Sequence, residues 1–206
     1  MRDGAAARLA ALKARPKKPG EASFYWYDAH FASPAVKVLP GEYYAATDDL
    51  LVMTTLGSCI AACLWDRQAH VGGLNHFMLA EGGDDSGRYG SYAMELLINE
   101  LMKLGATRAT LEAKVFGGGQ VMSGMDTLRV GERNTAFVLD YLRTERIPIV
   151  SKDVLDVYPR KVCFLPKSGK AMVKRLAATH GGELAARERA VASRPAADGG
   201  GSVDLF

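Results

Sequence analysis

Hydrophobic positions along the chain follow two different periods, which predict strands in some segments and helices in others. The run Ile60 to Trp65 is continuously apolar, so it predicts a strand that is covered on both faces. Residues 66–70 then form the loop of a hairpin with the next apolar run. Similar short runs, bounded by turn residues, predict strands at residues 36–39, 50–54, 60–65, 71–79, 108–116, 147–150 and 161–165.

Helical spacing is clearest at residues 91–104, where apolar side chains recur every three or four positions and form one stripe. Ser91 is the expected N-cap of this helix, and Gly105 is expected just beyond its C-terminus. A second helix is predicted near residues 132–146. Because predicted strands outnumber helices and often follow one another, the pattern favours an α+β fold over a doubly wound parallel sheet.

The strands and helices fall into one predicted domain at residues 35–177, between two extensions. Residues 1–34 begin with a basic, Ala-rich stretch, which we expect to be a solvated and partly helical segment. The alternative is that this stretch binds an acidic surface of a partner protein. Five aromatic side chains at 24–31 are expected to lie against the domain or a partner. Residues 178–206 are rich in small and charged residues, which predicts disorder.

Composition narrows the functional classes. The 206 residues are 48% hydrophobic and 24% charged, which is ordinary for a globular protein. The net charge of +3 is too small to indicate a nucleic-acid partner. No apolar run reaches the roughly 18 residues of a membrane helix, and the N-terminus lacks the apolar region of a signal peptide. We therefore expect a cytoplasmic protein without membrane insertion, whose three cysteines stay reduced.

Cys59 and His76 form a candidate nucleophile and base. The predicted hairpin brings their segments together, and Gly57 permits a bend that turns backbone N–H groups towards whatever Cys59 attacks. A free thiol with a pKa of about 8.5 is mostly protonated at neutral pH, so it needs an imidazole to accept its proton. The simpler alternative is that Cys59 is a small apolar core residue.

A zinc site is the rival interpretation of the same region, because Cys59, Cys63, His70 and His76 have a superficially ligand-like order. Six residues separate Cys63 from His70, whereas a zinc finger of this class has about twelve. In a regular strand, Cys59 and Cys63 would also be about 13 Å apart. We therefore expect no metal, and we expect Cys63 and Cys163 to be inert core thiols. No cofactor is expected either, because Gly117–Gly119 lacks the ending of a phosphate loop.

Five motifs follow one another along the chain: Leu56-Gly-Ser-Cys59, Asn75-His-Phe-Met-Leu79, Lys114-Val-Phe-Gly-Gly-Gly119, Gly131-Glu-Arg-Asn134 and Arg160-Lys-Val-Cys-Phe164. In this order they resemble the motifs of the CheD family of chemoreceptor glutamine deamidases. The resemblance covers about residues 36–177, nearly the whole predicted domain.

The resemblance implies a fold, a reaction and partners. The fold would be an α+β sandwich of mixed sheets with flanking helices, similar to the catalytic domain of cytotoxic necrotising factors. The family converts glutamines of methyl-accepting chemotaxis receptors to glutamates; a methylesterase side activity would use the same chemistry. Members also bind a CheC-type phosphatase, so a binding-only regulator of receptors or of such a phosphatase is the alternative function.

The resemblance also implies roles for particular residues. Cys59 would be the nucleophile, His76 the general base and acid, and a threonine shortly before the cysteine would orient the imidazole. A count without gaps places that threonine at Met53, so we assign the role to the adjacent Thr54, with Thr55 as the alternative. The family often has a proline where this chain has Ala80, which affects the local turn.

Overall fold

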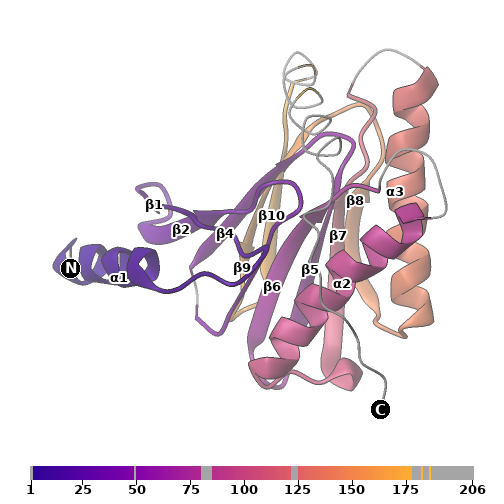
Figure 1. The fold of residues 1–206 in the computed structure, drawn as a ribbon. Helices are drawn as coiled ribbons and strands as arrows, with labels where there is room; N and C mark the ends of the chain where they lie inside the picture. The colour runs from indigo at the N-terminus through magenta and orange to yellow at the C-terminus, as the bar shows by residue number, and fades with distance from the viewer. Residues whose placement is uncertain are drawn as a thin grey trace.

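Two five-stranded sheets packed face to face form the body of the protein (Figure 1). The computed structural model describes residues 2–48, 50–79, 85–121 and 125–177, together with positions 182 and 186. The predicted disorder of residues 178–206 therefore concerns a segment that lies, except for those two positions, outside the described residues. The Ala80 turn is likewise outside them.

Sheet A has the strand order β3-β6-β5-β7-β8, and only its β7–β8 pair is parallel. Sheet B has the order β1-β2-β4-β9-β10, and only its β2–β4 pair is parallel. The strands of sheet A are β3 (Tyr43–Ala46), β5 (Ile60–Asp66), β6 (Val71–Phe77), β7 (Leu111–Gly117) and β8 (Ile149–Val154). Those of sheet B are β1 (Phe24–Asp28), β2 (Ser33–Lys37), β4 (Leu51–Leu56), β9 (Arg160–Leu165) and β10 (Lys170–Arg175). Both sheets are mixed, which confirms the predicted α+β class.

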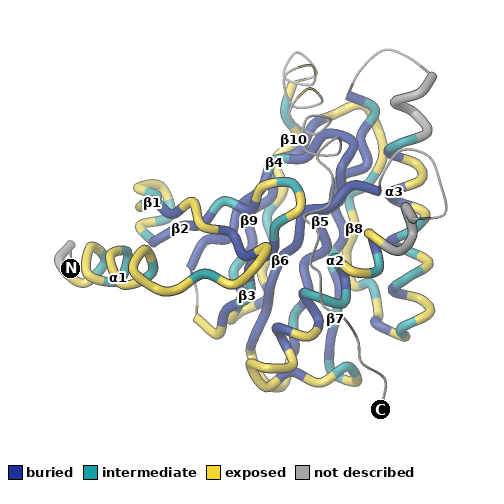
Figure 2. The backbone as a smooth tube through the Cα atoms, in the orientation of Figure 1, coloured by how far each residue is buried: buried dark blue, intermediate teal, exposed yellow. Residues whose placement is uncertain are grey.

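Two core layers lie on the two faces of sheet A. Ile60, Ala62 and Leu64 of β5 pack towards helices α2 (Asp85–Lys103) and α3 (Met125–Thr144), which cover the outer face of the sheet (Figure 1). Ala61 and Cys63 point the other way, into the layer between the two sheets. The continuously apolar β5 is therefore covered on both faces, as predicted, and the central strands of both sheets appear as the buried interior in Figure 2.

The start of the first long helix differs from the prediction. Ser91 was the expected N-cap, but α2 begins at Asp85 and Ser91 lies inside it. Gly90 resembles a helix breaker in the sequence, yet it is needed within α2, because a Cβ there would lie 2.5 Å from Phe137 of α3. The predicted end is confirmed: Gly105 has a φ of +100°, and the N–H of Ala106 donates to Leu101 O at 3.0 Å. The second helix also begins earlier than predicted, at Met125.

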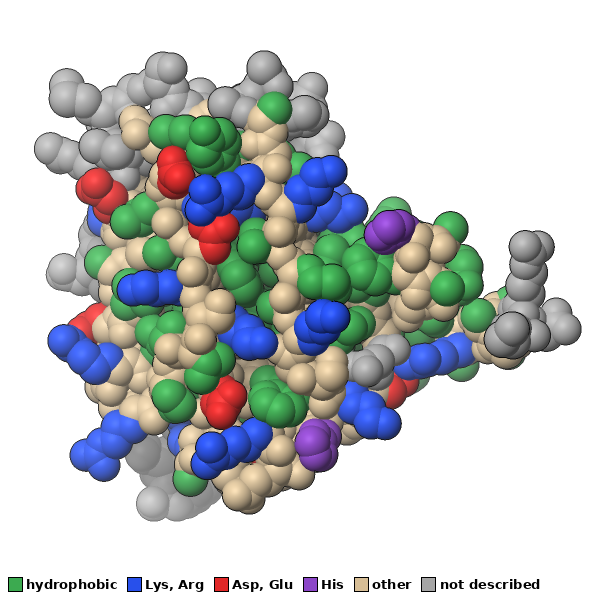
Figure 3. Space-filling view, turned by 180° about the vertical axis from the view of Figure 1, so that it is seen from behind, with side chains coloured by type: hydrophobic (Ala, Val, Ile, Leu, Met, Phe, Trp, Pro, Cys, Tyr) green, Lys and Arg blue, Asp and Glu red, His purple; other side chains and the backbone are tan. Residues whose placement is uncertain are grey.

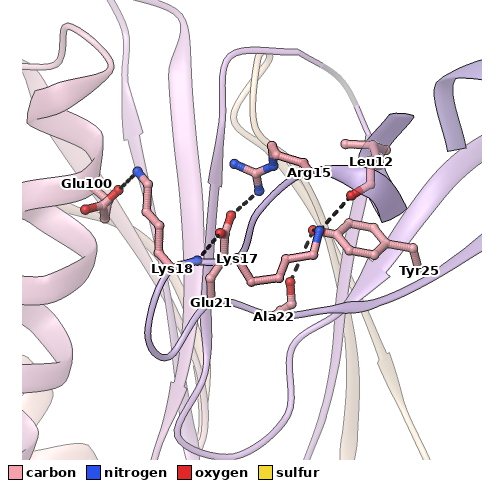
Figure 4. Close-up of polar contacts among 8 residues, drawn as sticks. All are labelled: Leu12, Arg15, Lys17, Lys18, Glu21, Ala22, Tyr25 and Glu100. Atoms are coloured by element: carbon pink, nitrogen blue, oxygen red, sulfur yellow. Dashed lines mark hydrogen bonds and ion pairs between the residues drawn. The ribbon is translucent and has the colours of Figure 1, made fainter. Parts of the chain in front are cut away.

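The N-terminal extension is folded onto the domain. Its helix α1 (Arg2–Ala14) confirms the predicted helicity, and Leu9 and Leu12 pack against the layer between the sheets. The aromatic residues at 24–27 lie in β1, which pairs with β2. The expectation for their side chains holds for Tyr25, which is 6% exposed, but not for Phe24 and Tyr27, which are 59% and 44% exposed. Polar contacts fix the connection: Arg15 pairs with Glu21, and Lys18 pairs with Glu100 of α2 (Figure 4).

Candidate active site

Thr54 and His76 meet across the space between the two sheets. Thr54 lies on β4 of sheet B and is fully buried, while His76 lies on β6 of sheet A and is 2% exposed. The Thr54 Oγ1 to His76 Nδ1 distance is 2.8 Å. Thr54 Oγ1 is also 2.8 Å from the carbonyl oxygen of Val38.

These two contacts determine which nitrogen of His76 carries the proton. A threonine hydroxyl has one hydrogen, and a carbonyl oxygen can only accept. The hydroxyl of Thr54 therefore donates to Val38 O and accepts from the Nδ1–H of His76. In the neutral imidazole this leaves the lone pair, and hence the basic position, on Nε2.

Strand alternation selects Thr54 over its neighbours. Met53 lies in the small cluster on the outer face of sheet B, and Thr55 shares that orientation because side chains alternate along a strand. Val52 and Leu56, which share the orientation of Thr54, lie in the layer between the sheets. Within residues 53–55, only position 54 is directed at His76.

Cys59 lies on the same face of sheet A as His76. Cys59 directly precedes β5, in which Ala61 is paired with His76 of β6. Cys59 and Ala61 both lie in the layer between the sheets, so the thiol and the imidazole are diagonal neighbours on one face. Cys59 is fully buried. The structure thus brings all three predicted residues into one layer, at the end of the β5–β6 hairpin.

The loop that carries Cys59 is held by hydrogen bonds to three successive carbonyl oxygens. Gly119 N–H donates to Gly57 O and Gly118 N–H donates to Cys59 O, both at 2.8 Å. The side chain of Asn134, on α3, donates to Ser58 O at 2.9 Å. Because C=O and N–H point in opposite directions in a trans peptide, this fixes the direction of the N–H groups of Ser58 and Cys59 as well.

Asn134 also holds the segment that follows His76. Its Oδ1 accepts the N–H of Leu79 at 3.0 Å, and the side chain is 1% exposed. One buried amide therefore connects the nucleophile loop with the end of the hairpin that carries the base. Asn134 has no predicted role in the sequence, where its place in the Gly131–Asn134 motif was the only signal.

Glycines allow the supporting segment to approach the loop closely. Gly117 has a φ of +113°, and a Cβ on it would lie 2.1 Å from Cys59 O. A Cβ on Gly131 of α3 would lie 2.4 Å from Gly118 O. The Gly117–Gly119 turn therefore borders the loop that carries Cys59, and Gly117 and Gly118 allow the backbones to approach closely.

Tyr89 lies on the solvent side of this region. Burial raises the pKa of its hydroxyl, and the charge that Cys59 would carry as a thiolate raises it further. This second effect means that the phenol is within electrostatic range of Cys59. Tyr89 is itself 37% exposed.

The other two cysteines have a different environment. Burial raises the pKa of both the Cys63 and the Cys163 thiol, which keeps them protonated. His70, the third member of the rival zinc set, lies in the turn at the opposite end of the hairpin from Cys59. Within the described part of the chain, no three His, Cys, Asp or Glu side chains are grouped so that they could hold a metal ion.

Comparisons with known proteins point to one family. A family model described as CheD chemotactic sensory transduction matches residues 78–175. The chain is 61% identical to a probable chemoreceptor glutamine deamidase CheD 1 of Albidiferax ferrireducens, over 98% of this chain and 88% of that protein. It is 51% identical to a probable chemoreceptor glutamine deamidase CheD of Thiobacillus denitrificans, over 88% and 94% of the two chains.

A third relative and one solved structure extend the comparison. The probable chemoreceptor glutamine deamidase CheD of Methylobacillus flagellatus is 46% identical over 94% of this chain and its own full length. A hypothetical protein of Bacillus licheniformis, YfiH, shares 14% identity and 56% coverage of this chain with a TM-score of 0.36, which is too low to assign a fold. None of the described helices is both long and apolar enough to span a bilayer.

Proposed function

Because the chain belongs to the CheD family, we propose that it deamidates glutamine side chains of chemotaxis receptors, with Cys59 as the nucleophile. The named relatives are probable chemoreceptor glutamine deamidases and are similar over nearly their whole length. The observation that supports the mechanism is the hydrogen bond that His76 Nδ1–H donates to Thr54 Oγ1, in the same layer as Cys59. It places the lone pair of the neutral imidazole on Nε2, the nitrogen that accepts a proton.

The reaction begins with proton transfer from the Cys59 Sγ to His76 Nε2. The thiolate attacks Cδ of the substrate glutamine and forms a C–S bond, while the carbonyl π electrons move to the oxygen. When the tetrahedral intermediate collapses, the C–N bond breaks and His76 donates its proton to the departing ammonia. A water molecule, deprotonated by the same imidazole, then hydrolyses the thioester and releases glutamate and the free thiol.

Backbone N–H groups of the nucleophile loop stabilise the oxyanion. The carbonyl oxygens of Gly57, Ser58 and Cys59 accept hydrogen bonds from Gly119, Asn134 and Gly118. The N–H groups of the same peptides point the opposite way and are held there without reorganisation during the reaction. Loss of one such donor in other enzymes costs roughly a hundredfold or more in kcat.

Further properties follow from the same chemistry. A methyl ester of glutamate is an acyl substrate of the same shape, so a receptor methylesterase side activity is part of the proposal.

We place the enzyme in the cytoplasm, assign it a fold like that of cytotoxic necrotising factors, and include a CheC-type phosphatase as a second partner. A pull-down with a purified CheC-type protein tests the last point, and absence of binding would remove it.

Ammonia release from a purified receptor cytoplasmic fragment tests the proposal. The wild-type protein should release ammonia, and Cys59→Ala should release none while keeping the wild-type circular dichroism spectrum. Cys63→Ala is the matched control, since it removes another buried thiol, whose pKa burial raises, and should retain activity. Full activity in Cys59→Ala would exclude the nucleophile, and a folded wild type that releases no ammonia would exclude the function.

A further inference from the structure

The outer face of sheet B is an apolar surface that no described helix covers. Strand alternation defines it: Val36, Val52, Val162 and Phe164 face sheet A, so their neighbours face outwards. The outward cluster consists of Ala35, Leu51, Met53 and Cys163, which are 0–7% exposed, and of the partly exposed Trp26, Phe31, Leu165 and Met172, which pack against them. Phe24, next to Trp26 with ring centroids 5.9 Å apart, is 59% exposed.

Sheet A shows what such a face normally requires. Its own outer face is buried under α2 and α3, because the apolar face of a sheet is stable only when another layer covers it. Sheet B has no such layer within the described residues, and its outer side is among the surfaces seen in Figure 3. Hydrophobic side chains lie there between Lys and Arg side chains. The apolar side chains that reach the solvent here are Phe24 and the partly exposed Trp26, Phe31, Leu165 and Met172. Apolar side chains grouped in this way at the surface indicate an interaction site.

The charges on this face have one predominant sign. Lys37, Lys161, Lys170 and Lys174 share the outward orientation of Met53, Cys163 and Met172 along their strands. None of the four takes part in an ion pair among the described residues. Asp28 is an acid with the same orientation, at the end of β1, and it accepts the N–H groups of His30 and Phe31 in its own turn.

Two of these lysines oppose one another directly. Lys161 of β9 is the cross-strand partner of Lys174 of β10. Like charges in this position destabilise a sheet, whereas opposite charges stabilise it. The arrangement therefore works against the stability of sheet B, which is the kind of local conflict expected at a binding site.

We propose that this lysine-framed apolar face binds a helix of the receptor substrate that carries an apolar stripe bordered by carboxylates. A helix covers the partly exposed apolar side chains, and its acidic border neutralises the four lysines. A second copy of this chain would place lysines against lysines in a symmetric interface, so the charge disfavours it. The inference rests on the proposed receptor deamidation, which it deepens by assigning a docking surface apart from the site.

The face is continuous with the nucleophile loop. Lys161 is paired with Thr55 of β4, and β4 ends at Leu56, directly before the Gly57–Cys59 segment. A helix bound along the outer face therefore starts close to the loop that carries the thiol. Binding there would hold the receptor near Cys59 without contact to Thr54, Cys59 or His76.

Steady-state deamidation of a receptor cytoplasmic fragment tests this surface. The double variant Lys161→Glu/Lys174→Glu should have a KM about tenfold above that of the wild type at low salt and a kcat within about twofold. At high salt, the two KM values should be much closer, because salt screens the charges. Lys13→Glu/Lys152→Glu, which makes the same charge change on α1 and β8, should leave KM unchanged. Alkylation of Cys59 by iodoacetamide should proceed at the wild-type rate in both variants.

A single substitution distinguishes loss of binding from loss of folding, because it should change KM and the melting temperature in a combination that unfolding does not produce. Lys161→Glu creates an opposite-charge pair with Lys174, so it should raise the melting temperature while it also raises KM. An unchanged KM in the double variant, with an active wild type, would overturn the surface and leave the proposed function intact. A change in oligomeric state, measured by light scattering, would instead assign the face to a second copy and also overturn the inference.

Discussion

At the residue scale, the proposed mechanism depends on one hydroxyl group that has two partners. Thr54 donates to Val38 O and accepts from His76 Nδ1, each at 2.8 Å. Since the hydroxyl has one proton, both contacts are satisfied only when Nδ1 of His76 is protonated and Nε2 is basic. In the proposed mechanism, Thr54 therefore acts through His76, as a positioning residue.

Replacing Thr54 with valine tests that role, because valine keeps the shape and removes the oxygen. We expect kcat for ammonia release to fall roughly ten- to a hundredfold, as when other residues that orient a histidine are removed. The pH dependence of Cys59 alkylation should shift as well, since a different imidazole proton arrangement would face the thiol. Thr54→Ser keeps the hydroxyl, so it should retain most of the wild-type kcat and the wild-type pH dependence of alkylation. A fully active Thr54→Val would contradict the tautomer argument.

The sequence was sufficient to identify the candidate reacting residues, Cys59 and His76, but not all of the residues that hold them in place. Cys59 and His76 are recognisable because each lies in a distinctive motif and one short hairpin connects them. Thr54 could be separated from Met53 and Thr55 only when the orientation of β4 was known. Asn134 is 76 residues from its partner Ser58, and nothing in the local pattern of either segment indicates that they meet.

At the element scale, the Gly117–Gly119 turn is the support on which the nucleophile loop rests. It ends β7, next to β5, and donates two of the hydrogen bonds to the loop carbonyls. Only a residue without a side chain fits at Gly117, because its φ is +113° and Cys59 O lies where a Cβ would be. Displacement of this turn would displace Cys59.

Two alanine substitutions separate backbone strain from displacement of the loop. Gly105 has a φ of +100°, and a Cβ at this position would have no atom within 4 Å. Gly105→Ala should therefore cost only the strain, about 1 kcal/mol, with kcat unchanged. Gly117→Ala should lower the free energy of unfolding by more than this, and it should also lower kcat at least tenfold in the folded fraction. Urea unfolding and ammonia release measure the two effects. Equal behaviour of the two variants would show that Gly117 has no special role.

The strands that the sequence pattern missed are all at the edges of the sheets. These are β3 in sheet A, and β1 and β10 in sheet B. An edge strand has one side exposed and needs fewer apolar residues, so its pattern is weak; β10, for example, reads Lys-Ala-Met-Val-Lys-Arg. Central strands such as β5 and β6 were predicted because burial on both faces makes them continuously apolar.

At the scale of the whole molecule, the site belongs to both sheets, since β4 supplies Thr54 and the β5–β6 hairpin supplies Cys59 and His76. Anything that separates the sheets or frays the hairpin should therefore reduce activity. Asp66 secures the far end of the hairpin. Its carboxylate accepts backbone N–H groups of Gln68, Ala69 and Thr107, at 2.8–2.9 Å, and the hydroxyl of Thr110.

The pH dependence of stability tests this contribution. Burial alone would raise the pKa of Asp66, but the hydrogen bonds, first that of Thr110, outweigh it and lower the pKa to about 2. A lowered folded-state pKa stabilises the protein above the unfolded-state value, and this contribution is lost as the pH falls. The free energy of unfolding should therefore fall by about 2 kcal/mol between about pH 4 and about pH 2.

Asp66→Asn should remove this part of the pH dependence in urea unfolding and lower the free energy of unfolding near neutral pH. The pKa values of Glu100 and Asp153 are also lowered by their basic partners, against the effect of burial, so some acid sensitivity should remain. Asp140→Asn is the control, since its carboxyl group is 63% exposed on α3. An unchanged pH profile in Asp66→Asn would refute the assigned role.

The most direct test of the account is mass spectrometry of a receptor cytoplasmic fragment incubated with the protein in heavy-oxygen water. We predict that particular glutamines become glutamates with one heavy oxygen in each new carboxylate, because water opens the thioester at Cys59. The conversion should be absent with Cys59→Ala. An unmodified receptor, or the same conversion with the Cys59→Ala variant, would contradict the central claim.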